Sequence, residues 1–128
     1  MSIAFQGAVI LVKDVIASRL FYEELLGQKV AVDFGEVVGF EAGFSIWQAD
    51  HSYTILFDKK YDEQQRLGSN NFELFFEDSE IHDIWKSVSS RDIKLVHPLK
   101  EQPWGQLVFR IYDPDGHIVE IGGQYLSL

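Results

Sequence analysis

The sequence repeats one pattern of apolar and polar residues at an offset of 64, the distance from Asp14 to Asp78. In each half a short apolar run precedes the aspartate, which is a good N-cap residue for a helix. The apolar residues that follow recur at helical spacing and predict a helix with one buried stripe. The pairs in register are Ala17 and Ile81, Leu20 and Ile84, and Phe21 and Trp85. This repeat predicts two copies of one folding unit.

Strands are expected on both sides of each helix. Branched and aromatic residues predict strands at 8–12, 29–34, 37–41 and 44–48, and residues 53–57 are a candidate for one more. In the second half we expect strands at 72–76 and 94–97, the latter ended by Pro98, followed by a hairpin. The fold class predicted is α+β, with two tandem βαβββ modules forming curved mixed sheets around a cavity and the helices outside.

The chain is expected to form one domain, with module one at about 1–58 and module two at 72–128. Residues 59–71 are polar and show no apolar period, which is typical of a linker. The segment is long enough to cover a binding site as a flap.

The last quarter of the chain predicts a β-hairpin. Residues 107–112 are rich in branched and aromatic side chains, and Asp113-Pro-Asp-Gly116 is a turn sequence with a proline and a glycine at suitable positions. With a four-residue loop, Tyr112 is expected to pair with His117, and Phe109 with Glu120.

Glu120 lies between Val119 and Ile121 on the returning strand. A carboxylate on such a strand must face water, a partner or a ligand, because burying an unpaired charge is costly. Glu120 is therefore either part of a solvated sheet face or a residue at the floor of a ligand cavity.

Trp104-Gly105, an apolar strand, and then Asp113-Pro-Asp-Gly-His-x-x-Glu-Ile121 resemble the closing signature of the vicinal oxygen chelate superfamily. This superfamily includes glyoxalase I, bleomycin-resistance proteins and extradiol dioxygenases. The resemblance implies paired βαβββ modules, in agreement with the repeat. It also implies that the position of Glu120 is a metal ligand in the metal-dependent members.

The other metal positions that the resemblance implies carry weak ligands. The first falls near Gly7, beside Gln6, and the third falls at Phe72, between Asn71 and Glu73. The second offers Trp47 or Gln48, and an amide oxygen is a weak ligand beside a carboxylate or an imidazole. A catalytic divalent metal needs about three protein ligands and an open position. We therefore expect no cofactor; a divalent metal is disfavoured, and Glu120 would be its ligand.

Composition narrows the range of partners. The formal net charge is −9, which argues against nucleic acid or an anionic membrane surface as a partner. The chain contains no cysteine, so disulfide and thiolate chemistry are absent. No stretch approaches the length of a membrane span or a signal peptide, and we expect a cytoplasmic protein.

No known catalytic motif occurs in the sequence, and the four histidines lack metal-ligand spacing. We interpret the histidines as surface or structural residues. Glu73 and Glu120 would form an acid–base pair if their strands adjoin, but Glu73 alternates with Leu74, which favours a solvent-facing Glu73.

Aromatic residues are abundant on the expected strands, and most will belong to the core. A cavity lined by several rings, with polar anchors, suits a flat or cationic small molecule. The catalytic residues are unknown; the candidate ligand-binding residues are Gln48, Trp47, Trp104, Phe109, Glu120 and Glu73.

The sequence favours a small-molecule-binding protein similar to bleomycin-resistance proteins, with an incomplete metal-ligand set, that sequesters an aromatic or cationic ligand. The resemblance also implies a homodimer. Two alternatives stay open: a metal-dependent glyoxalase-like lyase or dioxygenase-type enzyme, and a structural or regulatory dimer with a vestigial cavity.

Overall fold

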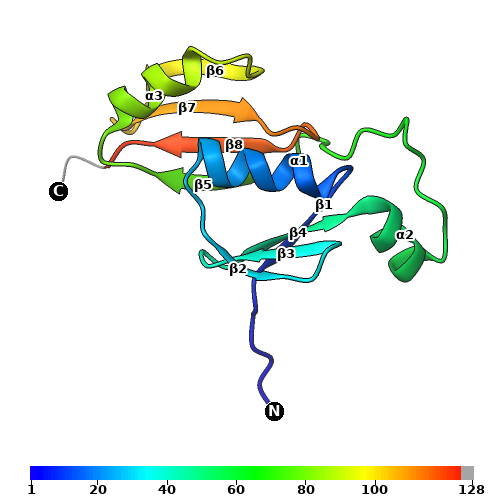
Figure 1. Cartoon of the computed structure of the whole chain (residues 1–128). Coiled ribbons are helices and arrows are strands. Elements are labelled where there is room, and N and C mark those ends of the chain that lie inside the picture. The colour runs from blue at the N-terminus through cyan, green and yellow to red at the C-terminus, as the bar shows by residue number, and fades with distance from the viewer. Residues whose placement is uncertain (125–128) are drawn as a thin grey trace. The chain divides into compact units, whose positions relative to one another are not determined.

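The computed structural model describes residues 1–124 and divides the chain into two compact units, residues 1–67 and 68–128. Each unit contains a four-stranded mixed sheet (Figure 1). The strand orders are β1-β4-β3-β2 and β5-β8-β7-β6, so the same topology occurs twice. This confirms the prediction of an α+β fold with two tandem βαβββ modules. The predicted cavity stays a prediction.

In unit 1, strand β1 (Ala8–Val12) leads into helix α1 (Val15–Leu20), which continues as a π-helical turn, η1 (Phe21–Leu25). Asp14 caps α1 as predicted, because its side chain accepts hydrogen bonds from the backbone N–H groups of Ile16 and Ala17. Strands β2 (Val30–Asp33), β3 (Val37–Phe40) and β4 (Phe44–Gln48) complete the sheet, and β1 pairs with β4 in parallel.

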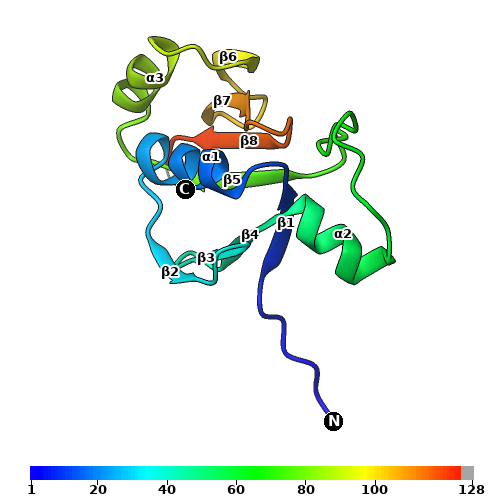
Figure 2. The same cartoon turned by 45° about the vertical axis from the view of Figure 1, so that its right-hand side comes forward.

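Residues 53–57 belong to helix α2 (Ala49–Phe57), so the prediction of a strand there was wrong. Figure 2 shows α2 following β4 and lying beside β1. The buried face of α2 consists of the small residues Ala49 and Ser52, and Tyr53 packs edge-on against Phe57, one helical turn later. This local packing overrides the high strand propensity of the side chains in this segment.

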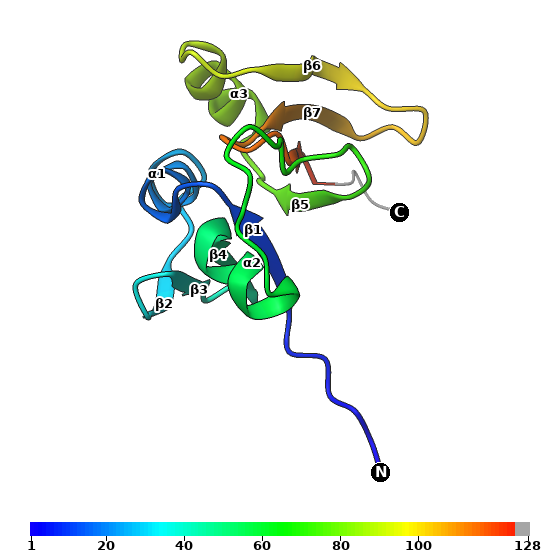
Figure 3. The same ribbon diagram turned by 90° about the vertical axis from the view of Figure 1, so that its right-hand side faces the viewer.

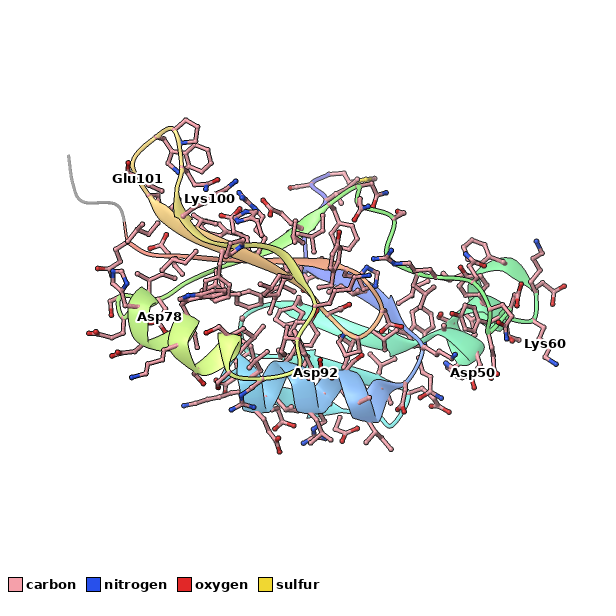
Figure 4. All side chains as sticks on the ribbon, turned by 90° about the horizontal axis from the view of Figure 1, so that it is seen from above. Asp50, Lys60, Asp78, Asp92, Lys100 and Glu101 are labelled. Carbon is pink, nitrogen blue, oxygen red and sulfur yellow. The ribbon has the colours of Figure 1, made fainter. Side chains whose placement is uncertain are left out.

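In unit 2, strand β5 (Glu73–Glu77) pairs in parallel with β8 (Ile118–Gly122), and helix α3 (Ile81–Ser89) follows β5. Strand β6 (Leu95–Glu101) forms the edge and pairs with β7 (Leu107–Tyr112), as Figure 3 shows. Pro98 was predicted to end β6 but lies inside it, where the register is irregular. An edge strand tolerates proline at such a position. Asp78 was predicted to cap α3, but the helix begins at Ile81 with Glu80 as its N-cap, and the Asp78 side chain accepts a hydrogen bond from the Glu80 backbone N–H at 2.7 Å. Figure 4 labels Asp78 near the beginning of α3, and Lys100 and Glu101 at the far end of β6.

The closing hairpin differs from the prediction by one residue. Tyr112 pairs with Ile118, and Phe109 pairs with Ile121, because the turn spans Asp113 to His117. The Asp113 carboxylate accepts hydrogen bonds from the backbone N–H groups of Asp115 and His117, which holds this longer turn. The observed register places Arg110 directly opposite Glu120.

Each unit uses a glycine to bring two backbone segments together. A Cβ atom at Gly7 would lie 2.0 Å from the Gly43 carbonyl oxygen, and a Cβ atom at Gly68 would lie 2.0 Å from the Gly116 carbonyl oxygen. In both units the chain ahead of the first strand therefore packs against the turn before the last strand.

The core of each unit lies between its sheet and the helix that follows the first strand. In unit 1, Tyr22 packs against Phe40 and Phe44; in unit 2, Trp85 of α3 packs against Phe109. The opposite face of each sheet, which we call the open face, carries the alternate side chains. On β7 and β8 the open face includes Arg110 and Glu120.

Candidate functional site

The open face of the sheet in unit 2 carries a cluster of charged and polar side chains centred on Arg110. Arg110 Nε lies 2.9 Å and Nη2 lies 2.5 Å from Glu120 Oε1, and Nε lies 3.1 Å from Glu73 Oε2. Nη1 donates to Gln102 Oε1 at 3.1 Å and lies 2.8 Å from His97 Nε2. Each strand of this sheet contributes one of these groups, and Gln102, the residue just after β6, adds a fifth.

The sequence places these side chains together through register. Glu120 lies opposite Arg110 on β7 and opposite Phe75 on β5. Side chains directly opposite each other in a sheet share a face, and so do residues two positions apart along a strand. Glu73 and Phe75 therefore lie on the same face as Arg110 and Glu120.

The cluster is shielded from water to different degrees. The side chains of Glu120 and Arg110 are 7% and 19% exposed, whereas the Glu73 side chain is 38% exposed. Phe75, next to them on β5, is 54% exposed. The cluster thus has a sheltered ion pair at its base and an accessible carboxylate and aromatic ring at its edge.

Burial raises the pKa of Glu120 above its ordinary value, and a hydrogen bond with Glu73 raises this pKa further. The hydrogen bond and the positive charge of Arg110 act in the opposite direction. Two carboxyl groups near one guanidinium repel each other, so the more buried one holds its proton more tightly.

The tautomer of His97 follows from its two contacts. Arginine is only a donor, so the Nε2 atom facing Arg110 must accept, and the Nδ1 atom, 2.8 Å from the Pro98 carbonyl oxygen, must carry the hydrogen. His97 thereby joins Arg110 to the backbone of β6.

A metal ion, which the superfamily resemblance implies near Glu120, does not fit these residues as they are placed. The Glu120 carboxylate accepts from a guanidinium that is always protonated. Within residues 1–124, no group of three or more His, Cys, Asp or Glu side chains is arranged to hold a metal ion.

Of the residues predicted for the site, Glu73 and Glu120 are brought together. Phe109 is fully buried and packs against Trp85 on the helix side of the sheet. Trp104 is half exposed in the β6–β7 connection, where its Nε1 donates to Gln106 Oε1 at 2.9 Å.

Trp47 and Gln48 belong to unit 1. The Trp47 indole donates to His51 Nδ1 at 2.9 Å, and Gln48 Oε1 accepts from the Val15 backbone N–H at 3.2 Å. Gln48 also lines a groove of about 460 Å³ between α1 and the β2–β3 turn, together with Arg19 and Asp33.

Sequence reasoning missed Arg110, His97 and Gln102. Arg110 alternates with Phe109 and Ile111 on an otherwise apolar strand, which is the same signal that drew attention to Glu120. With the correct hairpin register the two would have been paired.

A family model described as a glyoxalase-like domain matches residues 5–125. The chain belongs to the glyoxalase-like domain family. A solved protein of unknown function from Agrobacterium tumefaciens str. C58 is 34% identical to it, with a TM-score of 0.89 over 97% of this chain and 96% of the other. This confirms the resemblance to the vicinal oxygen chelate superfamily.

Two more distant structures share the fold of this glyoxalase-like domain. A lactoylglutathione lyase from Agrobacterium tumefaciens is 20% identical, with a TM-score of 0.71 over 96% of this chain and 95% of the other. A glyoxalase/bleomycin resistance protein/dioxygenase from Nocardioides is 17% identical, with a TM-score of 0.70 over 100% of this chain and 88% of the other. The search of curated proteins gave no match. Among the described residues, no helix has the length and apolar character needed to cross a membrane.

Proposed function

We propose that this glyoxalase-like domain binds a small organic molecule on the open face of unit 2, without a metal ion. The observation that carries the proposal is the Arg110 guanidinium held between Glu73 and Glu120, at the position where the superfamily resemblance implies a metal. Two carboxylates and one guanidinium leave a formal charge of −1 when both acids are ionised. The Glu73 side chain, at 38% exposure, carries the accessible part of that charge.

The ligand class follows from the two accessible groups at the edge of the cluster. Phe75 presents a half-exposed ring beside the Glu73 carboxylate on the same strand face. A positively charged group is attracted both to a carboxylate and to the face of an aromatic ring. We infer a ligand with an amine or quaternary ammonium next to a flat ring.

The test is a thermal-shift screen of the chelator-treated protein against aromatic amines, with benzyltrimethylammonium as the minimal probe. A ligand at 100 times its Kd stabilises the folded state by about 2.7 kcal/mol. We expect Glu73→Gln and Phe75→Ala each to weaken binding in isothermal titration at least tenfold. Glu23→Gln and Phe34→Ala, which change an acid and an exposed ring in unit 1, serve as matched controls.

The runner-up, a metal-dependent glyoxalase-like enzyme, is separated by metal analysis of untagged protein purified without added metal. Stoichiometric Ni, Zn, Mn or Fe that is lost in Glu120→Ala would contradict our proposal. Absence of any ligand-induced shift, with no bound metal, would favour a scaffold with a vestigial cavity. The homodimer and the cytoplasmic location stay predictions, and light scattering of the purified chain tests the first.

A further inference from the structure

The atoms that surround the Arg110 guanidinium are of the types that bind metal cations. Two are carboxylate oxygens, from Glu73 and Glu120, one is the unprotonated Nε2 of His97, and one is the amide oxygen of Gln102. Oxygen and imidazole ligands of this kind suit divalent first-row metals. They lie within 2.5–3.1 Å of the three guanidinium nitrogens, so all of them face this one side chain and surround it.

The support behind these groups also resembles that of a cation site. His97 donates its Nδ1–H to the Pro98 carbonyl oxygen, which fixes the ring with Nε2 facing Arg110. Histidines that bind metals are usually held in this way by a backbone carbonyl or a carboxylate. Glu120 and Gln102 are each 7% exposed or less, so their orientation is set by packing.

We propose that Glu73, His97, Gln102 and Glu120 form a cation site whose permanent occupant is the side chain of Arg110. The guanidinium supplies the positive charge that these groups need and links residues of β5, β6, β7 and β8 on the open face. Because arginine stays protonated, the site is filled whatever the supply of metal. Removing the arginine side chain opens the site to an external cation. This inference does not depend on the organic ligand proposed above.

The experiment compares Arg110→Ala with wild type in titrations with Zn²⁺, Ni²⁺ and methylguanidinium. We expect one equivalent of Zn²⁺ or Ni²⁺ in Arg110→Ala and none in wild type, and we expect millimolar methylguanidinium to raise the Tm of the variant only. Adding His97→Ala or Glu120→Gln should weaken metal binding at least tenfold. The matched control is Arg19→Ala in unit 1, which removes an arginine that pairs with the carboxylates of Glu23 and Asp33.

Four results would overturn the proposal. One is a folded Arg110→Ala that binds neither metal nor methylguanidinium, and another is one equivalent of metal in wild type. If Arg110→Ala is unfolded alone, refolding with Zn²⁺ or methylguanidinium should recover its circular dichroism, and failure with both counts against the site. The fourth result comes from wild type itself: long-range ¹⁵N NMR must show the Nδ1–H tautomer of His97, and the Nε2–H form excludes the arrangement. These readouts use no organic ligand, so they are independent of the proposed function.

Discussion

The two units share one pattern of strand pairing, but at equivalent positions on the open face unit 1 carries apolar side chains and unit 2 carries charged ones. Residues of β3 and β4 correspond to residues of β7 and β8 at an offset of 73, because Val37 pairs with Trp47 as Arg110 pairs with Glu120. Residues of β1 and β5 correspond at an offset of 64, since Leu11 pairs with Trp47 as Phe75 pairs with Glu120. Therefore Val9, Val37 and Trp47 occupy in unit 1 the positions that Glu73, Arg110 and Glu120 occupy in unit 2.

The helix-facing side differs far less. Ile46 corresponds to Val119, and both are fully buried. Val38 corresponds to Ile111, and these side chains are 2% and 0% exposed. A duplicated fold thus keeps the apolar residues that pack against its helix, whereas the other face is free to change. Function is best sought on the face where the two copies disagree.

The largest effect is expected where the units agree. Ile46→Ala and Val119→Ala each remove methyl groups from a closed core and should cost about 3 kcal/mol of unfolding free energy. Urea unfolding followed by fluorescence measures both. A large difference between the two variants would contradict the equivalence of the two cores.

Arg110→Ala should destabilise by about 2–3 kcal/mol, because the nearly buried Glu120 loses its counter-charge. The corresponding change in unit 1, Val37→Ala, removes two methyl groups from a half-buried position and should cost about 1 kcal/mol. The same urea experiment compares them. Equal losses would mean that the ion pair does no more than an apolar contact.

Replacing the charged side chains of the unit 2 cluster with apolar ones tests whether the charges contribute to stability. The triple variant Glu73→Val, Arg110→Val and Glu120→Leu should have an unfolding free energy that is within about 1 kcal/mol of the wild-type value or higher. The reason is that apolar side chains often replace a buried ion pair without loss of stability. We expect this variant to lose its binding of benzyltrimethylammonium, measured by isothermal titration. A triple variant as unstable as Arg110→Ala would assign the cluster a stabilising role.

Glu73→Gln should lower the pKa of Glu120, because it removes a neighbouring carboxylate that raises it. In wild type the folded pKa lies above the ordinary value of 4.5, so the folded state binds the proton more tightly than the unfolded state. The resulting stabilisation is complete below about pH 4.5 and is lost as the pH rises through the folded pKa. Carboxyl ¹³C NMR measures the titration midpoint of Glu120. An unchanged midpoint in Glu73→Gln would show that Glu73 does not affect the pKa of Glu120.

The smallest effect concerns the other arginine that lies between two carboxylates. Arg19 contacts Glu23 and Asp33 on the surface of unit 1, where water screens the charges. Arg19→Ala should leave the urea midpoint unchanged within experimental error. A loss comparable to that of Arg110→Ala would show that burial does not explain the difference between the two clusters.

The repeat, the Asp14 cap and most strands were predictable because they depend on local periodicity. Helix α2 was not, since its buried face is made of Ala49 and Ser52, which give no apolar stripe. The Arg110 cluster was missed because the turn is held by two backbone bonds to the Asp113 side chain, and these set the register. Turn chemistry of this kind is not visible in residue periodicity.

The five residues from Asp113 to His117 therefore make this hairpin intolerant of insertions and deletions. Loss of one residue from the turn would shift β8 against β7 by one position and would point the Glu120 carboxylate at the apolar layer under α3. A change of length at this turn would exchange the polar and apolar sides of the last strand.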